Sequence, residues 1–75
     1  MKTMYINGGK KEKIRAGDIL GALVNEAGLT SDQVGQINIF EKQSYVAIHG
    51  DVLHTVIPKL LNGKIKGRKF KVGEA

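Results

Sequence analysis

The chain has 75 residues, which is enough for one small domain with a thin core. It has no cysteine and two histidines, so disulfides, thiolate metal sites and a dedicated zinc site are excluded, and a reducing, cytoplasmic setting is expected. No apolar run approaches the length of a membrane span, and the N-terminus lacks the apolar region of a signal peptide. We therefore expect no membrane partner, no metal and no cofactor.

The formal net charge is +5, and most of the positive charge lies in two segments. Residues 10–15 contain four basic side chains and residues 64–71 contain five, which together are nine of the twelve in the chain. Like charges side by side repel, so this concentration indicates an anionic partner if the fold brings the two segments together. Nucleic acid is the first candidate.

Apolar periodicity predicts the elements of the first half of the chain. Apolar and polar residues alternate over residues 3–7, which predicts a strand, and the glycines and charges that follow end it. Helical spacing of apolar residues predicts a helix over 16–27, and the Thr-x-x-Gln form at 30–33 predicts a single capped turn. Two more alternating segments, 35–40 and 43–48, predict a pair of strands with a tight connection.

The second half adds a helix and a final strand. An apolar stripe predicts a helix over 50–63. Pro58 removes one helical hydrogen bond and costs about 3 kcal/mol in a helix interior, so we expect a kink or a break near His54 but not a lost helix. Alternation then predicts a strand over 68–72, with Gly67 marking a turn before it.

This order of elements predicts an α+β fold, a ferredoxin-like βαββαβ sandwich. Right-handed crossovers place the first and third strands in the centre of a four-stranded antiparallel sheet, with two helices on one face. The helix-covered face is expected to take Met4, Ile6, Ile37, Ile39, Val46, Ile48, Phe70 and Val72. The open face is expected to carry Tyr5, Asn7, Asn38, Phe40, Gln43, Tyr45, Lys69 and Lys71.

Two tyrosines on this open face favour RNA as the partner. Tyr5 and Tyr45 fall on adjacent central strands and are predicted to point away from the core. Proteins that read single-stranded RNA stack bases on such side chains, at roughly 1–3 kcal/mol per base. The alternative is that the two rings pair across the strands and only stabilise the sheet. The nearby basic residues favour the binding role.

Two segments resemble the RNA recognition motif. "MYINGG" is similar to the first-strand motif of that family, with Tyr5 at the stacking position. "EKQSYVAI" aligns with the third-strand motif, where Ser44, Tyr45 and Val46 fit. Gln43 stands in place of a second aromatic residue, and its amide is suited to hydrogen-bond a base edge.

A second resemblance covers nearly the whole chain. "YINGGKKEKIRAGDILGAL", "VGQINIFEKQSYVAI" and "NGKIKGRKFKV" resemble the C-terminal RNA-binding domain of the DbpA-type DEAD-box helicases of bacteria. The resemblance implies an RNA-recognition-motif-like domain over 1–75, folded over 3–73, at the C-terminal end of an ATP-dependent RNA helicase. It implies that the domain anchors a helicase core in cis on structured large-subunit ribosomal RNA during ribosome assembly. Cold-shock helicases of related architecture carry similar domains for less specific RNA binding.

The chain shows no motif for catalysis. It contains neither a Gly-x-x-x-x-Gly-Lys-Ser/Thr phosphate loop nor an Asp-Glu-Ala-Asp run, so the domain is not expected to be an enzyme. An acylphosphatase on a similar fold has no supporting residues. A small-ligand or protein-interaction module on the same fold, using the open sheet or an edge strand, is the remaining alternative.

The candidate RNA-binding residues form three surfaces. The first basic segment leads into a helix start, whose dipole favours phosphate. Structured RNA offers phosphates and few unstacked bases, so we rank the two basic segments above the tyrosines. Arg15 and Arg68 are the strongest single candidates, because a guanidinium grips a phosphate or a guanine edge with two hydrogen bonds; an ordinary ion pair or turn contact is the alternative for Arg68. The candidates are Lys10, Lys11, Lys13, Arg15, Lys66, Arg68, Lys69 and Lys71, with Tyr5, Asn7, Gln43 and Tyr45.

Overall fold

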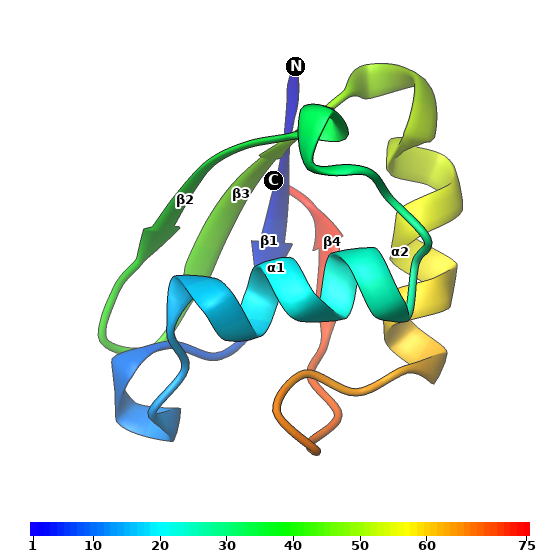
Figure 1. Cartoon of the computed structure of the whole chain (residues 1–75). Coiled ribbons are helices and arrows are strands. Elements are labelled where there is room, and N and C mark those ends of the chain that lie inside the picture. The colour runs from blue at the N-terminus through cyan, green and yellow to red at the C-terminus, as the bar shows by residue number, and fades with distance from the viewer.

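The structure, a computed structural model, describes residues 1–75, except that the side chain of residue 62 is not described. Three short 3-10 turns separate the larger elements, and none of the helices in the described residues is long and apolar enough to cross a membrane. The elements are β1 (Lys2–Ile6), η1 (Lys10–Glu12), α1 (Ala16–Asn25), η2 (Ser31–Gln33), β2 (Val34–Ile39), β3 (Ser44–Ile48), η3 (Gly50–Val52), α2 (Leu53–Asn62) and β4 (Val72–Glu74) (Figure 1).

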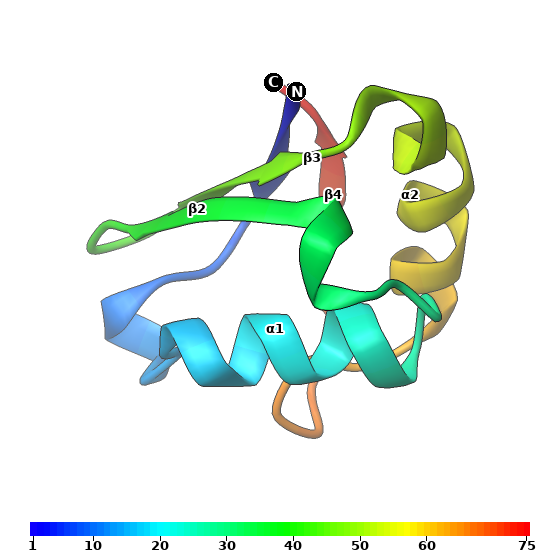
Figure 2. The ribbon, with the colours of Figure 1, turned by 45° about the horizontal axis from the view of Figure 1, so that its top comes forward.

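The four strands form one antiparallel sheet in the order β2-β3-β1-β4. β1 and β3 are therefore central, as predicted from right-handed crossovers. α1 lies as a second layer beneath the sheet, and α2 packs beside β4 (Figure 2). The predicted α+β, ferredoxin-like βαββαβ fold is confirmed.

The core lies between the sheet and the two helices. Every side chain predicted to face the helices is buried or packs, partly buried, against the core. The fully buried large side chains come from all the main layers and include Met4, Ile6, Val46 and Ile48 from the sheet, Ile19 and Leu23 from α1, and Leu53, Val56 and Leu60 from α2.

The last strand differs from the sequence prediction. A strand was expected over 68–72, but β4 spans Val72–Glu74. Before β4 begins, Lys71 is already joined to the residue after β1. The Asn7 amide donates to the Lys71 carbonyl oxygen at 2.8 Å. Lys69 therefore lies outside the sheet, and its predicted place on the open face is wrong.

Residues 65–68 form a small hairpin of their own before β4. The backbone groups of Ile65 and Arg68 bond to each other in both directions, at 2.8 and 3.0 Å. Lys66 and Gly67 at the tip both have positive φ, 53° and 75°, as a type I′ turn requires. Ile65 is buried and fixes the hairpin to the core. The predicted turn at Gly67 is thus confirmed.

Pro58 lies inside α2 without destroying it. The segment begins as the 3-10 turn η3 and becomes α-helical at Leu53, one residue before His54. The prediction that the helix persists is confirmed, and the change of helix type falls where a break was expected.

Candidate nucleic-acid interface

The first basic segment is held against the turn between β2 and β3. The amides of Lys10 and Lys11 donate to the carbonyl oxygens of Phe40 and Glu41 at 2.8 and 2.9 Å. This contact is so close that a Cβ atom on Gly9 would overlap the Phe40 oxygen. Glycine is needed here for space, so the Gly-Gly pair after β1 places η1 at the end of the sheet.

Ser44 fixes the start of the same loop. Its hydroxyl is completely buried and donates to the Gly8 carbonyl oxygen at 2.7 Å. A Cβ atom on Gly8 would stand 2.6 Å from the Phe70 ring and 2.9 Å from Ile14. The glycine loop is therefore enclosed by packing and by one buried hydrogen bond, which makes the position of η1 well defined.

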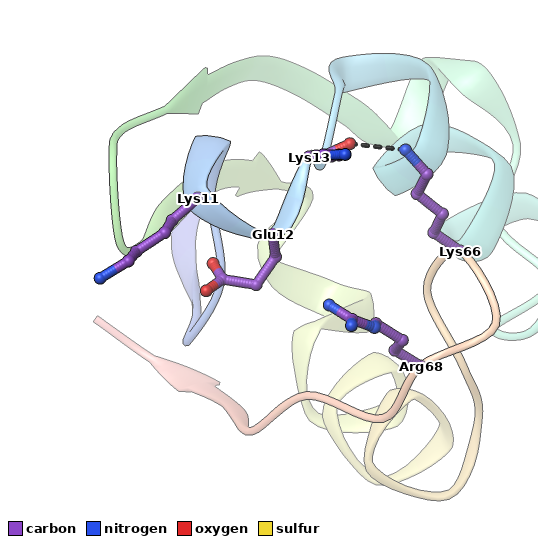
Figure 3. A pocket seen from close by; sticks show the side chains of 5 residues that line it. All are labelled: Lys11, Glu12, Lys13, Lys66 and Arg68. Carbon is purple, nitrogen blue, oxygen red and sulfur yellow. Dashed lines mark hydrogen bonds between the residues drawn. The ribbon is translucent and has the colours of Figure 1, made fainter.

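The two basic segments meet at this end of the molecule. The Lys66 ammonium, at the hairpin tip, donates to the Lys13 carbonyl oxygen at 2.7 Å and lies 3.8 Å from the Asp18 carboxylate. The basic groove that results has a volume of about 310 Å³ and is lined by Lys11, Glu12, Lys13, Lys66 and Arg68 (Figure 3). An adjoining hollow of about 320 Å³ shares two of these residues and is lined by Lys10, Lys13, Ile14, Arg15 and Lys66.

Two lysines of the groove occupy backbone conformations that favour glycine. Lys13 has φ 62° and Lys66 has φ 53°, and they are the two non-glycine residues with positive φ in the described backbone. Such conformations are uncommon for residues with a Cβ and cluster at functional sites. Lys13 ends η1 and Lys66 forms the tip of the 65–68 hairpin, and the Lys66 ammonium bonds the Lys13 carbonyl oxygen.

An acidic side chain lies beside the start of α1, where the helix dipole was expected to favour phosphate. The Asp18 carboxylate accepts a hydrogen bond at 3.0 Å from the amide of Arg15, the residue before the helix. It also pairs with Lys66, which places the positive charge of the hairpin beside the helix start. The Asp18 carboxylate thus offsets part of the positive charge at this end of the helix.

The open face of the sheet carries a row of three aromatic rings. Tyr5 and Tyr45 are register partners whose ring centroids lie 5.7 Å apart at 55°. Phe40, which was predicted on this face, lies edge-on to Tyr45 with ring centroids 5.8 Å apart and is 47% exposed. The Tyr5 hydroxyl bonds the exposed Asn7 amide oxygen at 3.3 Å. These contacts show the cross-strand pairing that was the alternative to base stacking, and each ring is still partly accessible.

The predicted site residues therefore divide into two places. Most residues of the two basic segments lie around the basic groove and its hollow, at the end of the sheet beside the start of α1. Tyr5 and Tyr45 lie on the open face, and Asn7 follows the end of the central strand β1. Gln43 is half-buried in the β2–β3 turn, where its carbonyl oxygen accepts from the Phe40 amide at 2.8 Å.

One groove residue, Glu12, was not among the candidates. Its carboxylate accepts a hydrogen bond from the Gly9 amide at 2.8 Å, across three residues. This is half of a capping box, a pattern usually recognised by a serine or threonine at the first position. Gly9 stands at that position here, so the capping pattern was not recognised in the sequence.

An α+β sandwich with one open sheet face and a cationic groove at its end defines a small nucleic-acid-binding domain of the RNA-recognition-motif type. The model of the family described as "DbpA RNA binding domain" matches residues 3–74, and the chain belongs to that family.

Curated relatives agree with this assignment. The chain is 43% identical over 72 residues to the ATP-dependent RNA helicase DbpA of Escherichia coli, which is 96% of this chain and 16% of the relative. It is 39% identical to the protein of that name from Bacillus subtilis, over 96% of this chain and 15% of the relative. The helicase DeaD of Mycobacterium tuberculosis is 34% identical over 89% of this chain. The chain thus spans about one-sixth of the length of the first two relatives.

Proposed function

We propose that this RNA-binding domain anchors a DEAD-box RNA helicase on structured RNA, with the basic groove as its principal contact. The observation that carries the proposal is the convergence of two segments, more than fifty positions apart in sequence, through the Lys66–Lys13 bond. A folded RNA presents closely spaced phosphates, and positioning on them depends chiefly on cationic side chains.

The arrangement of charges supports this role. Lys11, Lys13 and Arg68 line the groove, and none of them forms an ion pair with another described side chain. Lys66 is the exception, because its ammonium bonds the Lys13 carbonyl oxygen and pairs with Asp18. Lys11, Lys13 and Arg68 are therefore available to neutralise phosphates.

We further propose large-subunit ribosomal RNA as the target, ribosome assembly in the cytoplasm as the setting, and a helicase core in cis as the partner. The names of the relatives support a helicase context, since both DbpA proteins are ATP-dependent RNA helicases that extend well beyond the matched segment. On this proposal residues 1–75 form one C-terminal RNA-binding domain, and ATP hydrolysis belongs to the rest of the parent protein.

Salt dependence tests the RNA-binding role directly. With about four to six phosphates contacted, the logarithm of the association constant should fall with the logarithm of salt concentration at a slope of about −3 to −5. The measurement is a fluorescence-anisotropy titration of the domain with hairpins of large-subunit ribosomal RNA and with an unrelated hairpin of equal length. A flat salt response would contradict the proposal. Self-association without RNA binding would favour the protein-interaction alternative.

A further inference from the structure

The border strand β2 has backbone groups that no other element pairs. β3 bonds it on one side, and no strand of the described chain lies on the other (Figure 2). The Phe40 amide donates to the Gln43 carbonyl oxygen at 2.8 Å, so this amide is directed to β3. Because the direction alternates along an antiparallel strand, Asn38 also faces β3, and Ile37 and Ile39 direct their N–H and C=O groups outward. None of the backbone bonds from loops and caps in residues 1–75 reaches these outward groups.

β2 also lacks most of the features that keep an edge strand from pairing. Its six residues, VGQINI, include no charge and no proline, which are common protections of an edge. The bulge in the strand lies between Val34 and Ile37, and the residues from Ile37 to Ile39 pair regularly with β3. The opposite border is shorter, since β4 has three residues and ends on the charged Glu74. The β2 edge is therefore the one suited to accept a further strand.

An apolar strip of α1 continues this edge into the helix layer. Asp18 and Ala22 line a hollow beside the 65–68 hairpin, which leads to β4 at the far border of the sheet. At about 100° per residue, Leu20 and Val24 lie on the other side of the helix and face the β2 border. Leu20 is half-buried and Val24 is 41% exposed. α1 runs beneath β2 (Figure 2), so a partner that pairs with β2 also covers this strip.

We infer that two copies of the domain associate through this border, with β2 of one copy antiparallel to β2 of the other. A two-fold axis perpendicular to the sheet joins the two four-stranded sheets into one and keeps the helices of both copies on the same side. The outward groups of Ile37 and Ile39 then bond the second copy, and the strips of Leu20 and Val24 from the two α1 helices meet. The inference goes beyond the proposed RNA-binding function and does not depend on it.

The charges around β2 favour its own copy as the added strand. Asp32 precedes the strand, and Lys42 follows it in the turn to β3. Lys10 and Lys11, whose amides bond that turn, make its surroundings net basic despite Glu41. Antiparallel pairing brings the acidic start of each β2 beside the basic end of the other, which is a complementary arrangement. Neither Asp32 nor Lys42 forms an ion pair with another described side chain, so both are available for this contact.

Sedimentation velocity of the domain from micromolar to millimolar concentration is the first measurement, and a monomer–dimer equilibrium is the expected result. Asn38→Lys adds a charge to the exposed side of β2, and Val24→Lys adds one to the strip on α1. Two-fold symmetry brings each new charge near its own copy, so each variant should lower the dimer association constant about tenfold. Thr3→Lys and Thr55→Lys are the matched controls, because they add the same charge at exposed positions on β1 and α2 and should leave association unchanged.

Amide hydrogen exchange locates the contact. Exchange at Ile37 and Ile39 should slow as the dimer fraction rises, whereas Asn38, bonded within the sheet, should be protected at every concentration. A wild-type domain that stays monomeric throughout would overturn the inference and leave the proposed function standing. Association that Asn38→Lys and Val24→Lys leave intact would overturn it in the same way.

RNA binding is measured separately, on the wild type and on Val24→Lys. The basic groove lies on the hairpin side of α1, away from the strip, so both proteins should bind an RNA hairpin with equal affinity per groove. Failure of both to bind any RNA hairpin would overturn the proposed function and leave the dimer standing.

Discussion

Reversing two charges of the basic groove, Lys11→Glu together with Arg68→Glu, is expected to weaken binding of a ribosomal RNA hairpin by about 100-fold. Each reversal removes a phosphate contact and adds a repulsive charge, and removal of contacts also makes the salt dependence shallower by about one unit of slope per contact. The Lys11 backbone amide bonds the Glu41 oxygen and is unaffected by the substitution, so the melting temperature should stay nearly unchanged. Fluorescence anisotropy and a thermal melt on the same samples measure both quantities.

The matched control is Lys2→Glu with Lys59→Glu, which changes the total charge equally outside the groove. The ion pair of Lys2 with Glu74 is exposed and 3.8 Å long, so its loss has little effect on stability. This control should reduce affinity only slightly. If Tyr5→Ala and Tyr45→Ala weakened binding far more than the groove reversals, the aromatic row would be the principal surface and the ranking of the two surfaces would be wrong.

Gly9→Ala is expected to destabilise the domain by about 3 kcal/mol, because the added methyl group overlaps the Phe40 carbonyl oxygen and comes within 3.0 Å of backbone atoms of Gln43. These are main-chain atoms of a hydrogen-bonded turn, which cannot rotate away as a side-chain end can. For a domain of this size such a loss lowers the melting temperature by roughly 12–24 °C. Since the same loop positions η1, RNA affinity should fall even at temperatures where the variant is folded.

Gly21→Ala is the comparison for this variant. Gly21 lies inside α1, and a Cβ atom there meets nothing within 4 Å. Alanine has the higher helix propensity, so this change should raise stability by about 0.5–1 kcal/mol. Equal melting temperatures for Gly9→Ala and the wild type would show that the loop can shift, and the account of how η1 is placed would then be wrong.

The sequence predicts the fold well because its signals are local. The strands β1, β2 and β3 and the helix α2 are recognised from the spacing of apolar residues alone. The turn at 30–33 is recognised from Thr30 and Gln33, and in the structure the Thr30 amide donates to the Gln33 side-chain oxygen at 3.0 Å. The last strand was misplaced because residues 68–72 alternate equally well outside a sheet. Its true start depends on which residues find partners on β1, and periodicity contains no such information.

The sequence predicts which basic residues are candidates for the site, but it does not predict how they are arranged in space. Clusters of lysine and arginine are visible in the sequence, but their meeting depends on the hairpin at Lys66–Gly67 and on the loop after β1. The hydrogen bond from the Arg15 amide to the Asp18 carboxylate depends on local geometry that the spacing of charges does not show. Glu12 was overlooked because one acidic residue in a basic segment looks like ordinary solvation until its place in the groove is known.

The central claim is that RNA binds at the basic groove, at the end of the sheet, and not on its open face. An amide-resolved NMR titration of the isotope-labelled domain with a ribosomal RNA hairpin tests this most directly, because the wild-type chain reports on both surfaces at once. We expect the largest and earliest shift changes over residues 10–15 and 64–69, with small changes for Asn38 and Tyr45. Shift changes concentrated at Tyr5, Asn38 and Tyr45, with the two basic segments unmoved, would contradict the account.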